Sequence, residues 1–400
     1  MTYDVHKIRS HFPSLNTGLA FFCGPGGSQV PMVVGAAIAH AITKPISNRN
    51  TNTESEKNAE EYVVGFREAV GDLIYVDPRG VVYGRSWTQL TYDFSRTLAK
   101  NWGPGDEVVV SRLDHDSNVR PWIQAAEAVG ATIRWAELDT KTTEISVAAV
   151  EAVLSSQTKL VAITGAGNTI GTRPDLRGIG AAAHKVGALF YVDGVHLTPH
   201  APISVKDIGA DFFGFSFYKL MGPHCAALAA APALLETLSN DKLLPATNVV
   251  PERFEFGTLP YELMAGCIAA VNFIAEMAPG NGVTRREKIV NSMKALEQYE
   301  DELLEYLESS VAALPGVTLY GKAKQRTPTI YFSFAGHDSV DIYKAMALKN
   351  VTLPASNFYA LEVSRALGLG DAGALRAGLA PYSTREDVDR LIAGLRELTS

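Results

Sequence analysis

Short apolar runs rich in Val and Ile alternate with amphipathic helical patterns between about residues 60 and 240. The apolar runs barely alternate in polarity, which is typical of parallel strands that are buried on both faces. The segments between them have lengths suited to the crossover helices that join parallel strands. The pattern therefore predicts a mostly parallel sheet flanked by helices. The predicted strands are 107–111, 131–135, 159–163, 188–192 and 211–215, and the predicted helices are 87–101, 119–129, 147–154 and 176–186.

The pattern changes after Pro251, where two long helical segments precede strand-like runs and shorter helices. The predicted helices are 261–277, 286–314, 340–348 and a last one from Arg385, and the predicted strands are 317–320 and 328–334. This order is typical of an α+β unit. We therefore predict a large α/β domain over residues 20–260 and a smaller α+β domain formed by residues 1–19 and 261–400, which includes a connecting helix. The polar stretch 43–57 is predicted to be a loop, either mobile or covering a site.

Composition narrows the class of protein. A chain of 400 residues, of which 46% are hydrophobic, can bury a large core. A net charge of −7 gives no basic excess for binding nucleic acid or an anionic membrane. Three widely spaced cysteines fit neither a disulfide framework nor a metal site, and no apolar run approaches the roughly 20 residues of a membrane helix. We therefore expect a cytoplasmic protein with a small-molecule partner and no metal, nucleic-acid or membrane partner.

The strongest chemical signal lies in the stretch 191–224. Asp193 directly follows an apolar strand, at the carboxyl end where open α/β sheets bind ligands, and the next predicted strand leads into Ser216, Tyr218 and Lys219. Burial at a strand end can lower the pKa of a lysine, so that its neutral amine attacks a carbonyl group. Pyridoxal phosphate requires such a lysine, a carboxylate for its pyridine nitrogen and donors for its phosphate. This combination of side chains predicts a pyridoxal phosphate site.

The chain resembles the class V aminotransferases of fold type I, and within them the cysteine desulfurase-like group that includes selenocysteine lyases and isopenicillin N epimerases. The matching segments cover nearly the whole chain. The resemblance implies a fold type I enzyme that binds pyridoxal 5'-phosphate, with a mostly parallel sheet in the large domain and a smaller α+β domain. In order, these segments are FFCGPGGSQVP, GRSWTQLT, DHDSNVRPW, ITGAGNTIGT, VDGVH, SFYKLMGP, ERFEFGTLPY and LRAGLAPYSTREDVDRL.

The resemblance implies a catalytic role for three residues. Lys219 corresponds to the lysine that forms the Schiff base with the cofactor, and Asp193 to the partner of the pyridinium nitrogen. His196 lies where a Gln or His contacts the cofactor ring or its phenolic oxygen, and Asn168 matches the asparagine that hydrogen-bonds that oxygen. Taken outside this pattern, Asn168 could equally be a turn residue and His196 an interior histidine.

Further binding residues follow from the same resemblance. Phosphate contacts are expected from the turn Ser86-Trp87-Thr88, which opens a helix and so offers free backbone N–H groups, and from Ser216 and Tyr218. Thr258 matches a residue that reaches the phosphate of the neighbouring subunit, which implies a homodimer with shared active sites. Arg376 matches the arginine that binds the substrate α-carboxylate, a task suited to a bidentate guanidinium group. Gly26 and Tyr359 are expected on the substrate side.

The chain departs from the family pattern at two places. The stretch 352–362, where relatives carry a nucleophilic cysteine, contains none, so a persulfide mechanism that uses this loop is excluded. Asp116 takes the position of a histidine that stacks on the cofactor ring in many relatives. We count Asp116 among the cofactor contacts and expect the neighbouring His115 to point elsewhere. Cys23 and Cys225 lie near the site, although free cysteines are more often small buried hydrophobic residues than nucleophiles.

These observations lead to a hypothesis about activity. A cysteine desulfurase-like C–S lyase, which eliminates sulfur from Cβ of cysteine or of a cysteine S-conjugate without a persulfide cysteine, fits the subgroup and the missing loop cysteine. A class V aminotransferase is the alternative, and epimerisation or decarboxylation also stays open. The substrate side chain does not follow from the sequence, because it depends on the conformations of loops.

Two further classes of protein compete with this hypothesis. The segment TGAGNTIG, residues 164–171, follows a predicted strand and resembles a dinucleotide-binding motif, which would indicate a nicotinamide-dependent oxidoreductase. In that case the helix after Gly171 would begin too late, and Lys219 would have no task. A cofactor-free interaction protein with the same fold is the other candidate. Retention of both Lys219 and Asp193 argues against it.

Overall fold

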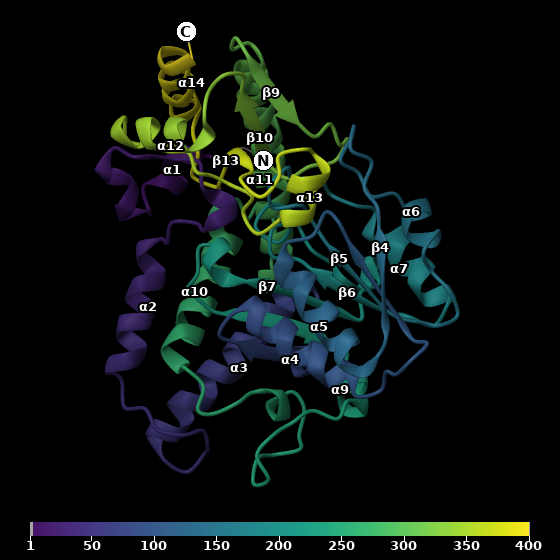
Figure 1. Ribbon diagram of the computed structural model, residues 1–400. Coiled ribbons are helices and arrows are strands. Elements are labelled where there is room, and N and C mark those ends of the chain that lie inside the picture. Colours follow the sequence, from purple (N-terminus) through teal and green to yellow (C-terminus); the bar gives the residue numbers. More distant parts are fainter. Residues whose placement is uncertain (1–2, 400) are drawn as a thin grey trace.

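A seven-stranded sheet forms the centre of the molecule in the computed structural model, which describes residues 3–399 (Figure 1). The strand order is β2-β8-β7-β6-β5-β3-β4. Strands β3 to β7 are parallel, whereas β8 runs antiparallel to both of its neighbours. Strand β2 therefore runs in the same direction as β3 to β7, and the carboxyl ends of these six strands lie along one edge of the sheet. The strands are β2 (Val81–Gly84), β3 (Glu107–Ser111), β4 (Thr132–Ala136), β5 (Thr158–Thr164), β6 (Leu189–Asp193), β7 (Phe212–Ser216) and β8 (Ala226–Ala230).

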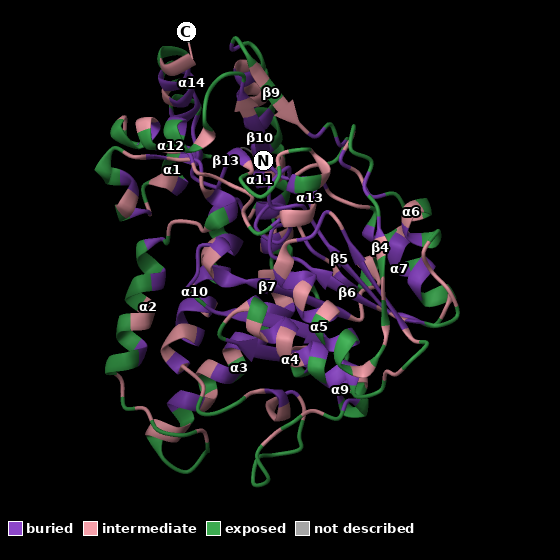
Figure 2. Ribbon diagram, viewed as in Figure 1, coloured by how far each residue is buried: buried purple, intermediate pink, exposed green. Residues whose placement is uncertain are grey.

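Helices cover both faces of this sheet, because successive residues of its buried strands point to opposite sides. Trp87 and Phe94 of α4 and Trp122 of α5 pack on one face. Helices α3, α7 and α10 pack on the other, and the strands between them are buried (Figure 2). The bounds are α3 (Glu54–Ile74), α4 (Trp87–Ala99), α5 (Arg120–Val129), α6 (Val147–Glu151), α7 (Leu176–Lys185), α8 (Val205–Ile208), α9 (Pro232–Thr237) and α10 (Tyr261–Met277).

Two expectations about these elements are wrong. The strand expected at 131–135 is not buried on both faces, since β4 lies at the edge of the sheet and exposes Thr132 and Arg134. The stretch 43–57 is not a loop throughout. Thr43, the first residue of this stretch, is the last residue of helix α2 (Met32–Thr43). Helix α3 begins at Glu54, after a capping box in which the Thr53 side chain accepts a hydrogen bond from the backbone N–H of Glu56.

A second, four-stranded antiparallel sheet has the order β12-β13-β10-β9. Apolar side chains of α11, α12 and α14 pack against it. Strand β1 pairs in parallel with β11 in a separate two-stranded sheet, and Ala20 and Phe22 pack in the same apolar cluster as the four-stranded sheet. The bounds are α1 (Val5–Arg9), β1 (Ala20–Phe21), α11 (Arg285–Ala312), β9 (Val317–Tyr320), β10 (Thr329–Phe334), α12 (Ser339–Leu348), β11 (Val351–Thr352), β12 (Ala355–Ser356), α13 (Leu361–Ala366), β13 (Ala374–Gly378) and α14 (Arg385–Thr399).

Helix α10 packs against α2 and α3, which belong to the predicted large domain. The predicted boundary near residue 260 nevertheless assigns α10 to the smaller domain. The division into domains therefore stays a prediction. Residues 1, 2 and 400, which it assigns to the smaller domain, lie outside the described residues. Within residues 3–399, every helix is too short or too polar to cross a membrane.

Candidate active site

Asp193 is the last residue of β6 and lies, buried, at the carboxyl edge of the large sheet. The indole Nε1–H of Trp87 donates to its Oδ2 at 2.7 Å, and the backbone N–H of Val195 donates to its Oδ1 at 2.9 Å. Burial raises the pKa of Asp193 to about 6, while these two donors and the charge of Lys219 act in the opposite direction. The carboxyl group is thus held in one orientation by two donors that favour its ionised form.

Lys219 ends the short 3₁₀ turn Phe217–Lys219 that follows the neighbouring strand β7, and it too is buried. Burial, together with the positive charge of Arg376, lowers the pKa of its amine to about 8. A lysine in water keeps its proton until about pH 10.4. Lys219 is therefore able to supply a neutral, nucleophilic amine close to neutral pH.

His196 and Asn168 each leave a buried polar atom without a partner among the described residues. The His196 Nε2 lies 3.0 Å and 3.1 Å from the hydroxyl oxygens of Thr327 and Thr329, whereas its Nδ1 has no hydrogen bond. The Asn168 Nδ2 donates to the carbonyl oxygen of Phe358 at 2.9 Å, and its Oδ1 has none. Because buried polar atoms are nearly always hydrogen-bonded, these two atoms indicate a polar ligand.

A narrow cavity of about 60 Å³, the inner cavity, is lined by most of the expected cofactor contacts. Ser86 caps α4, and its hydroxyl accepts the backbone N–H of Gln89 at 3.1 Å, so the first turn of the helix faces this cavity. The structure thus brings segments more than 100 residues apart to one place. The expected residues that line the inner cavity are Ser86, Trp87, Thr88, Asn168, Asp193, His196, Ser216, Tyr218 and Lys219.

The positions of His115 and Asp116 differ from expectation. His115, not Asp116, lines the inner cavity, because the segment is not regular: His115 caps a 3₁₀ turn, and its Nδ1 lies 2.8 Å from the Ser117 hydroxyl oxygen. Its ring stacks on Tyr359 with 5.5 Å between ring centroids. Burial and the nearby positive charges lower the pKa of His115 to about 3, so the imidazole is neutral. Asp116 instead turns to Arg120 and lies outside the inner cavity.

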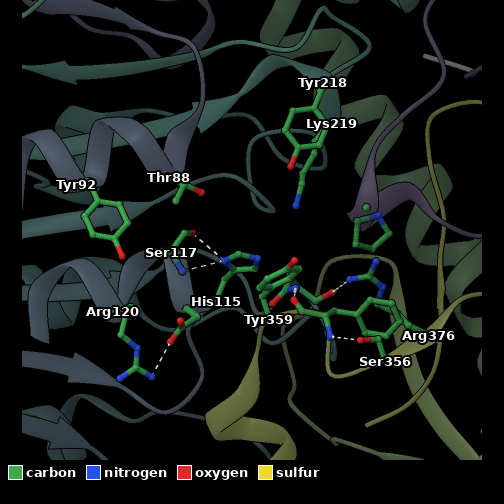
Figure 3. Close-up of a pocket in the computed structure, with 15 residues that line it drawn as sticks. Thr88, Tyr92, His115, Ser117, Arg120, Tyr218, Lys219, Ser356, Tyr359 and Arg376 are labelled. Carbon is green, nitrogen blue, oxygen red and sulfur yellow. Dashed lines mark hydrogen bonds and ion pairs between the residues drawn. The ribbon is translucent and has the colours of Figure 1, made fainter. Parts of the chain in front are cut away.

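A wider cavity of about 580 Å³, the outer cavity, opens next to the amine of Lys219 (Figure 3). Arg376 is 2% exposed there, its Nη1–H donates to the Asn168 carbonyl oxygen at 2.9 Å, and its Nε has no partner among the described residues. The guanidinium group lies 3.7 Å from the ring centroid of Phe358. A guanidinium group that is buried and incompletely bonded is suited to binding a carboxylate. Gly26 and the 73% exposed Tyr359 line the same cavity.

The remaining expected residues lie elsewhere. Thr258 lines a separate cavity of about 550 Å³ together with His224, whose ring stacks on Tyr218 at 5.1 Å. Cys225 contacts Cys267, with 3.2 Å between the two buried sulfur atoms. Cys23 lies behind Gly26, where a Cβ atom added to the glycine would meet the cysteine Sγ at 2.6 Å. Within residues 3–399, no group of His, Cys, Asp and Glu is arranged to hold a metal ion.

The sequence matches the family model described as aminotransferase class-V over residues 20–391. The chain belongs to the class V aminotransferase family. It is 31% identical to an uncharacterized protein of Mycobacterium tuberculosis, with both chains covered completely. It is 28% identical to a cysteine desulfurase of Klebsiella pneumoniae, covering 100% of this chain and 99% of the other. The crystal structure of an Escherichia coli cysteine desulfurase has the same fold, with a TM-score of 0.87, 24% identity and complete coverage of both chains.

Class V aminotransferases are pyridoxal phosphate enzymes, and the side chains that line the inner cavity suit this cofactor. The volume of about 60 Å³ is too small for the whole molecule, so the cofactor would also fill the part of the outer cavity next to Lys219. The lysine amine, the oriented carboxylate of Asp193 and the two unpartnered atoms of His196 and Asn168 are the groups that such a ring requires. Which residue makes each contact stays a prediction.

Two features of this class V site have no clear signal in the sequence. The bond from the Trp87 indole to Asp193 joins residues 106 positions apart, and only the packing of α4 on the sheet brings them together. The orientation of His115 depends on a 3₁₀ turn. The His115 ring accepts a hydrogen bond from the backbone N–H of Ser117, two residues later, and so caps this turn. This short-range spacing of His115 and Ser117 is the only sequence signal for the orientation of His115.

Proposed function

We propose that this class V enzyme is a C–S lyase that eliminates sulfur from Cβ of cysteine or of a cysteine S-conjugate. The observation that carries the proposal is the grouping of Lys219, Asp193 and Arg376 around one site, together with a substrate loop, residues 352–362, that contains no cysteine. The similarity to proteins named cysteine desulfurases supports it. Elimination needs no protein thiol, since the sulfur leaves with the bonding electrons of the Cβ–S bond.

The protein side chains divide the work of the reaction. Arg376 binds the substrate α-carboxylate and orients the Cα–H bond. Pyridoxal phosphate, when bound, supplies an electron sink for the negative charge that develops at Cα. The amine of Lys219 takes the Cα proton as general base and returns a proton to the leaving sulfur. Asp193, oriented by Trp87, balances positive charge at the ring nitrogen throughout.

The overall reaction is balanced without an oxidant. The Cα–H and Cβ–S bonds break, and the sulfur leaves as a thiol, or as sulfide when cysteine is the substrate. Water then replaces the amino group, so that pyruvate and ammonia are released. His115 stays neutral over the working pH range because its pKa is lowered to about 3, and it adds no charge beside the reacting atoms.

Comparison of wild type with Lys219→Ala tests this function. We expect the wild type to show the visible absorbance band of a protonated Schiff base, lost on borohydride reduction, and to release pyruvate and ammonia from L-cysteine or S-ethylcysteine. Lys219→Ala is expected to lose the lysine adduct and at least about a thousandfold in turnover, because the general base is gone. Formation of the adduct by apo-protein should accelerate up to about pH 8 and then level off, following the lowered pKa of the amine.

The exposed Lys206 on α8 offers a matched control, and Lys206→Ala should behave as wild type. Absence of the band in wild type after cofactor addition would refute a pyridoxal phosphate site. Conversion of the bound cofactor to its amine form, reversed by a keto acid and without release of pyruvate, would instead identify an aminotransferase.

We also propose that the enzyme is a cytoplasmic homodimer with shared active sites. Exposed apolar side chains of α2, namely Met32, Val33 and Ile42, and Phe256 beside Thr258 support an interface between two copies. The stacking of His224 on Tyr218 links the cavity of Thr258 to the inner cavity, which supports a role for Thr258 near a phosphate. Three free cysteines support a reducing compartment.

A further inference from the structure

The outer cavity has two polar ends, and only one of them serves the α-carboxylate. Figure 3 shows Arg376 and Ser356 on one side, Tyr92 and Arg120 on the other, and the amine of Lys219 pointing into the space between them. The volume of about 580 Å³ lies within the range of roughly 300–1,000 Å³ that is typical of small-molecule sites. The part of the outer cavity next to Lys219 shares its lining with the inner cavity and would be filled by the cofactor and the reacting carbons. Tyr92 and Arg120 do not line the inner cavity, so their end of the outer cavity is available to a substrate that extends beyond the reacting carbons.

The second end carries one full positive and one full negative charge. The Nη2–H of Arg120 donates to Oδ1 of Asp116 at 3.2 Å, and this is its one hydrogen bond among the described residues. A guanidinium group has five N–H donors, so most of them are left for a ligand. The side chains of Arg120 and Asp116 are 39% and 30% exposed, and both line the cavity. We call Tyr92, Asp116 and Arg120 the distal pocket.

The charges of the distal pocket select the chemistry of its ligand. A ligand group that is only anionic would be attracted by Arg120 and repelled by Asp116, and a group that is only cationic would meet the reverse. A group with both an ammonium and a carboxylate can bind both side chains at once. The hydroxyl of Tyr92 offers a further donor at the same end. An α-amino acid head group has this combination of charges.

We propose that the distal pocket binds the second amino acid head group of a thioether substrate in which two α-amino acids share one sulfur. The proposal rests on the C–S lyase function and names its substrate class. Arg376 then binds the carboxylate of the reacting half, and Arg120 and Asp116 bind the carboxylate and the ammonium of the other half. Lys219 takes the Cα proton, the Cβ–S bond breaks, and the sulfur leaves as the thiol of the second amino acid with one proton added. Water releases pyruvate and ammonia from the reacting half.

A series of cysteine thioethers separates the contributions of the two charges. Lanthionine carries both groups on the distal half, S-(2-carboxyethyl)cysteine only the carboxylate, S-(2-aminoethyl)cysteine only the ammonium, and S-ethylcysteine neither. With the holoenzyme, we expect KM for lanthionine to be at least about tenfold below the KM of each of the other three. A KM for lanthionine equal to that for S-ethylcysteine would overturn the proposal.

Variants assign the effect to the pocket. Arg120→Gln and Asp116→Asn are each expected to raise the ratio of KM for lanthionine to KM for S-ethylcysteine by about tenfold, with little change in kcat for lanthionine, because the lost contacts are present in ground state and transition state alike. Arg177→Gln, which removes an exposed arginine of another cavity, is the matched control and should leave the ratio unchanged. If Arg120→Gln and Asp116→Asn have the same ratio of KM values as Arg177→Gln, the role of the pocket is refuted.

A binding measurement distinguishes failure of the substrate class from failure of the reaction. 2,6-Diaminopimelate replaces the sulfur of lanthionine with a methylene group and has no leaving group, and norleucine lacks the second head group. Calorimetry of the holoenzyme should show that diaminopimelate binds at least about tenfold more tightly than norleucine, and that Arg120→Gln removes the difference. Tight binding without pyruvate from any thioether would support the pocket and refute the lyase. Equal binding of the two ligands would refute the pocket whatever the reaction.

Discussion

Trp87 determines the environment of Asp193, the carboxylate proposed to contact the cofactor. Its indole donates a hydrogen bond to Oδ2 of Asp193 and also stacks on Tyr191, with 5.3 Å between ring centroids. Trp87→Phe keeps an aromatic ring in place but removes the donor. We therefore expect the pKa of Asp193 to rise further above its usual range and the affinity of the apo-protein for pyridoxal phosphate to fall by about tenfold. Titration followed by absorbance measures this affinity.

Trp122→Phe is a suitable control for that substitution. Its indole Nε1–H donates to Oδ1 of Asn118 at 3.1 Å, so the variant loses one buried hydrogen bond that does not reach Asp193. Its cofactor affinity should stay close to that of wild type. Equal losses in both variants would show that the bond to Asp193 has no special effect.

At this scale, the sequence could predict that side chains at the ends of buried strands share one site, whereas it could not predict the direction of side chains on a turn. Lys219 and Asp193 each follow an apolar strand, and the end of a buried strand fixes a position in space. His115 and Asp116 lie on a turn, where one change in backbone direction exchanges their positions. The sequence pattern of a turn does not determine that direction, so their expected positions were exchanged.

At the scale of elements, strand β7 and helix α4 fit together because one position of the strand has no side chain. A Cβ atom on Gly214 would lie 1.9 Å from Cζ3 of Trp87. Gly214→Ala must therefore displace the indole, and we expect a loss of about 1–3 kcal/mol in the free energy of unfolding together with weaker cofactor binding. Chemical denaturation and cofactor titration measure the two effects.

Gly103→Ala provides the comparison, since nothing lies within 4 Å of the added methyl group and the backbone is not in the left-handed region. It should unfold at the same denaturant concentration as wild type, or higher. A Gly214→Ala protein with wild-type stability and cofactor affinity would show that the Trp87 indole can adopt another conformation without loss of packing.

The elements that the sequence predicts best are those with a strong period or a clear end. The strand at 107–111, the helix at 261–277 and the helix starting at Arg385 have the observed bounds. No strand was predicted at β2 or β8. Residues 226–230 are Ala-Ala-Leu-Ala-Ala, and alanine has a low preference for strands, so this segment is a strand because β7 and β2 pair with it. Tertiary pairing of this kind is invisible in local sequence.

At the scale of the whole molecule, the proposed dimer makes its own prediction. Met32 and Ile42 on α2 are 64% and 65% exposed. Charged side chains at an apolar interface are costly when buried, so Met32→Lys with Ile42→Lys should convert a dimer into monomers. The monomers should also bind the cofactor more weakly, since Thr258 of the partner subunit would be lost. Sedimentation velocity gives the mass of the particle.

Leu348→Lys is the control, because this residue of α12 is 89% exposed and lies on the smaller sheet's side of the molecule. Its sedimentation should match that of wild type. A wild-type protein that sediments as a monomer at all accessible concentrations would refute the dimer and, with it, the shared active site.

The pairing of β1 with β11 has a consequence for synthesis of the chain. Ala20 and Phe21 leave the ribosome early, yet their partners, Val351 and Thr352, follow roughly 330 residues later. At about 5–20 residues per second, the first strand waits on the order of tens of seconds with its backbone groups unpaired. During that interval the large sheet can form, and Phe12 can pack on Phe273 of α10, but Ala20 and Phe21 have no strand to pair with. The backbone groups of this short strand therefore stay unpaired until almost the whole chain between the two partners has been made.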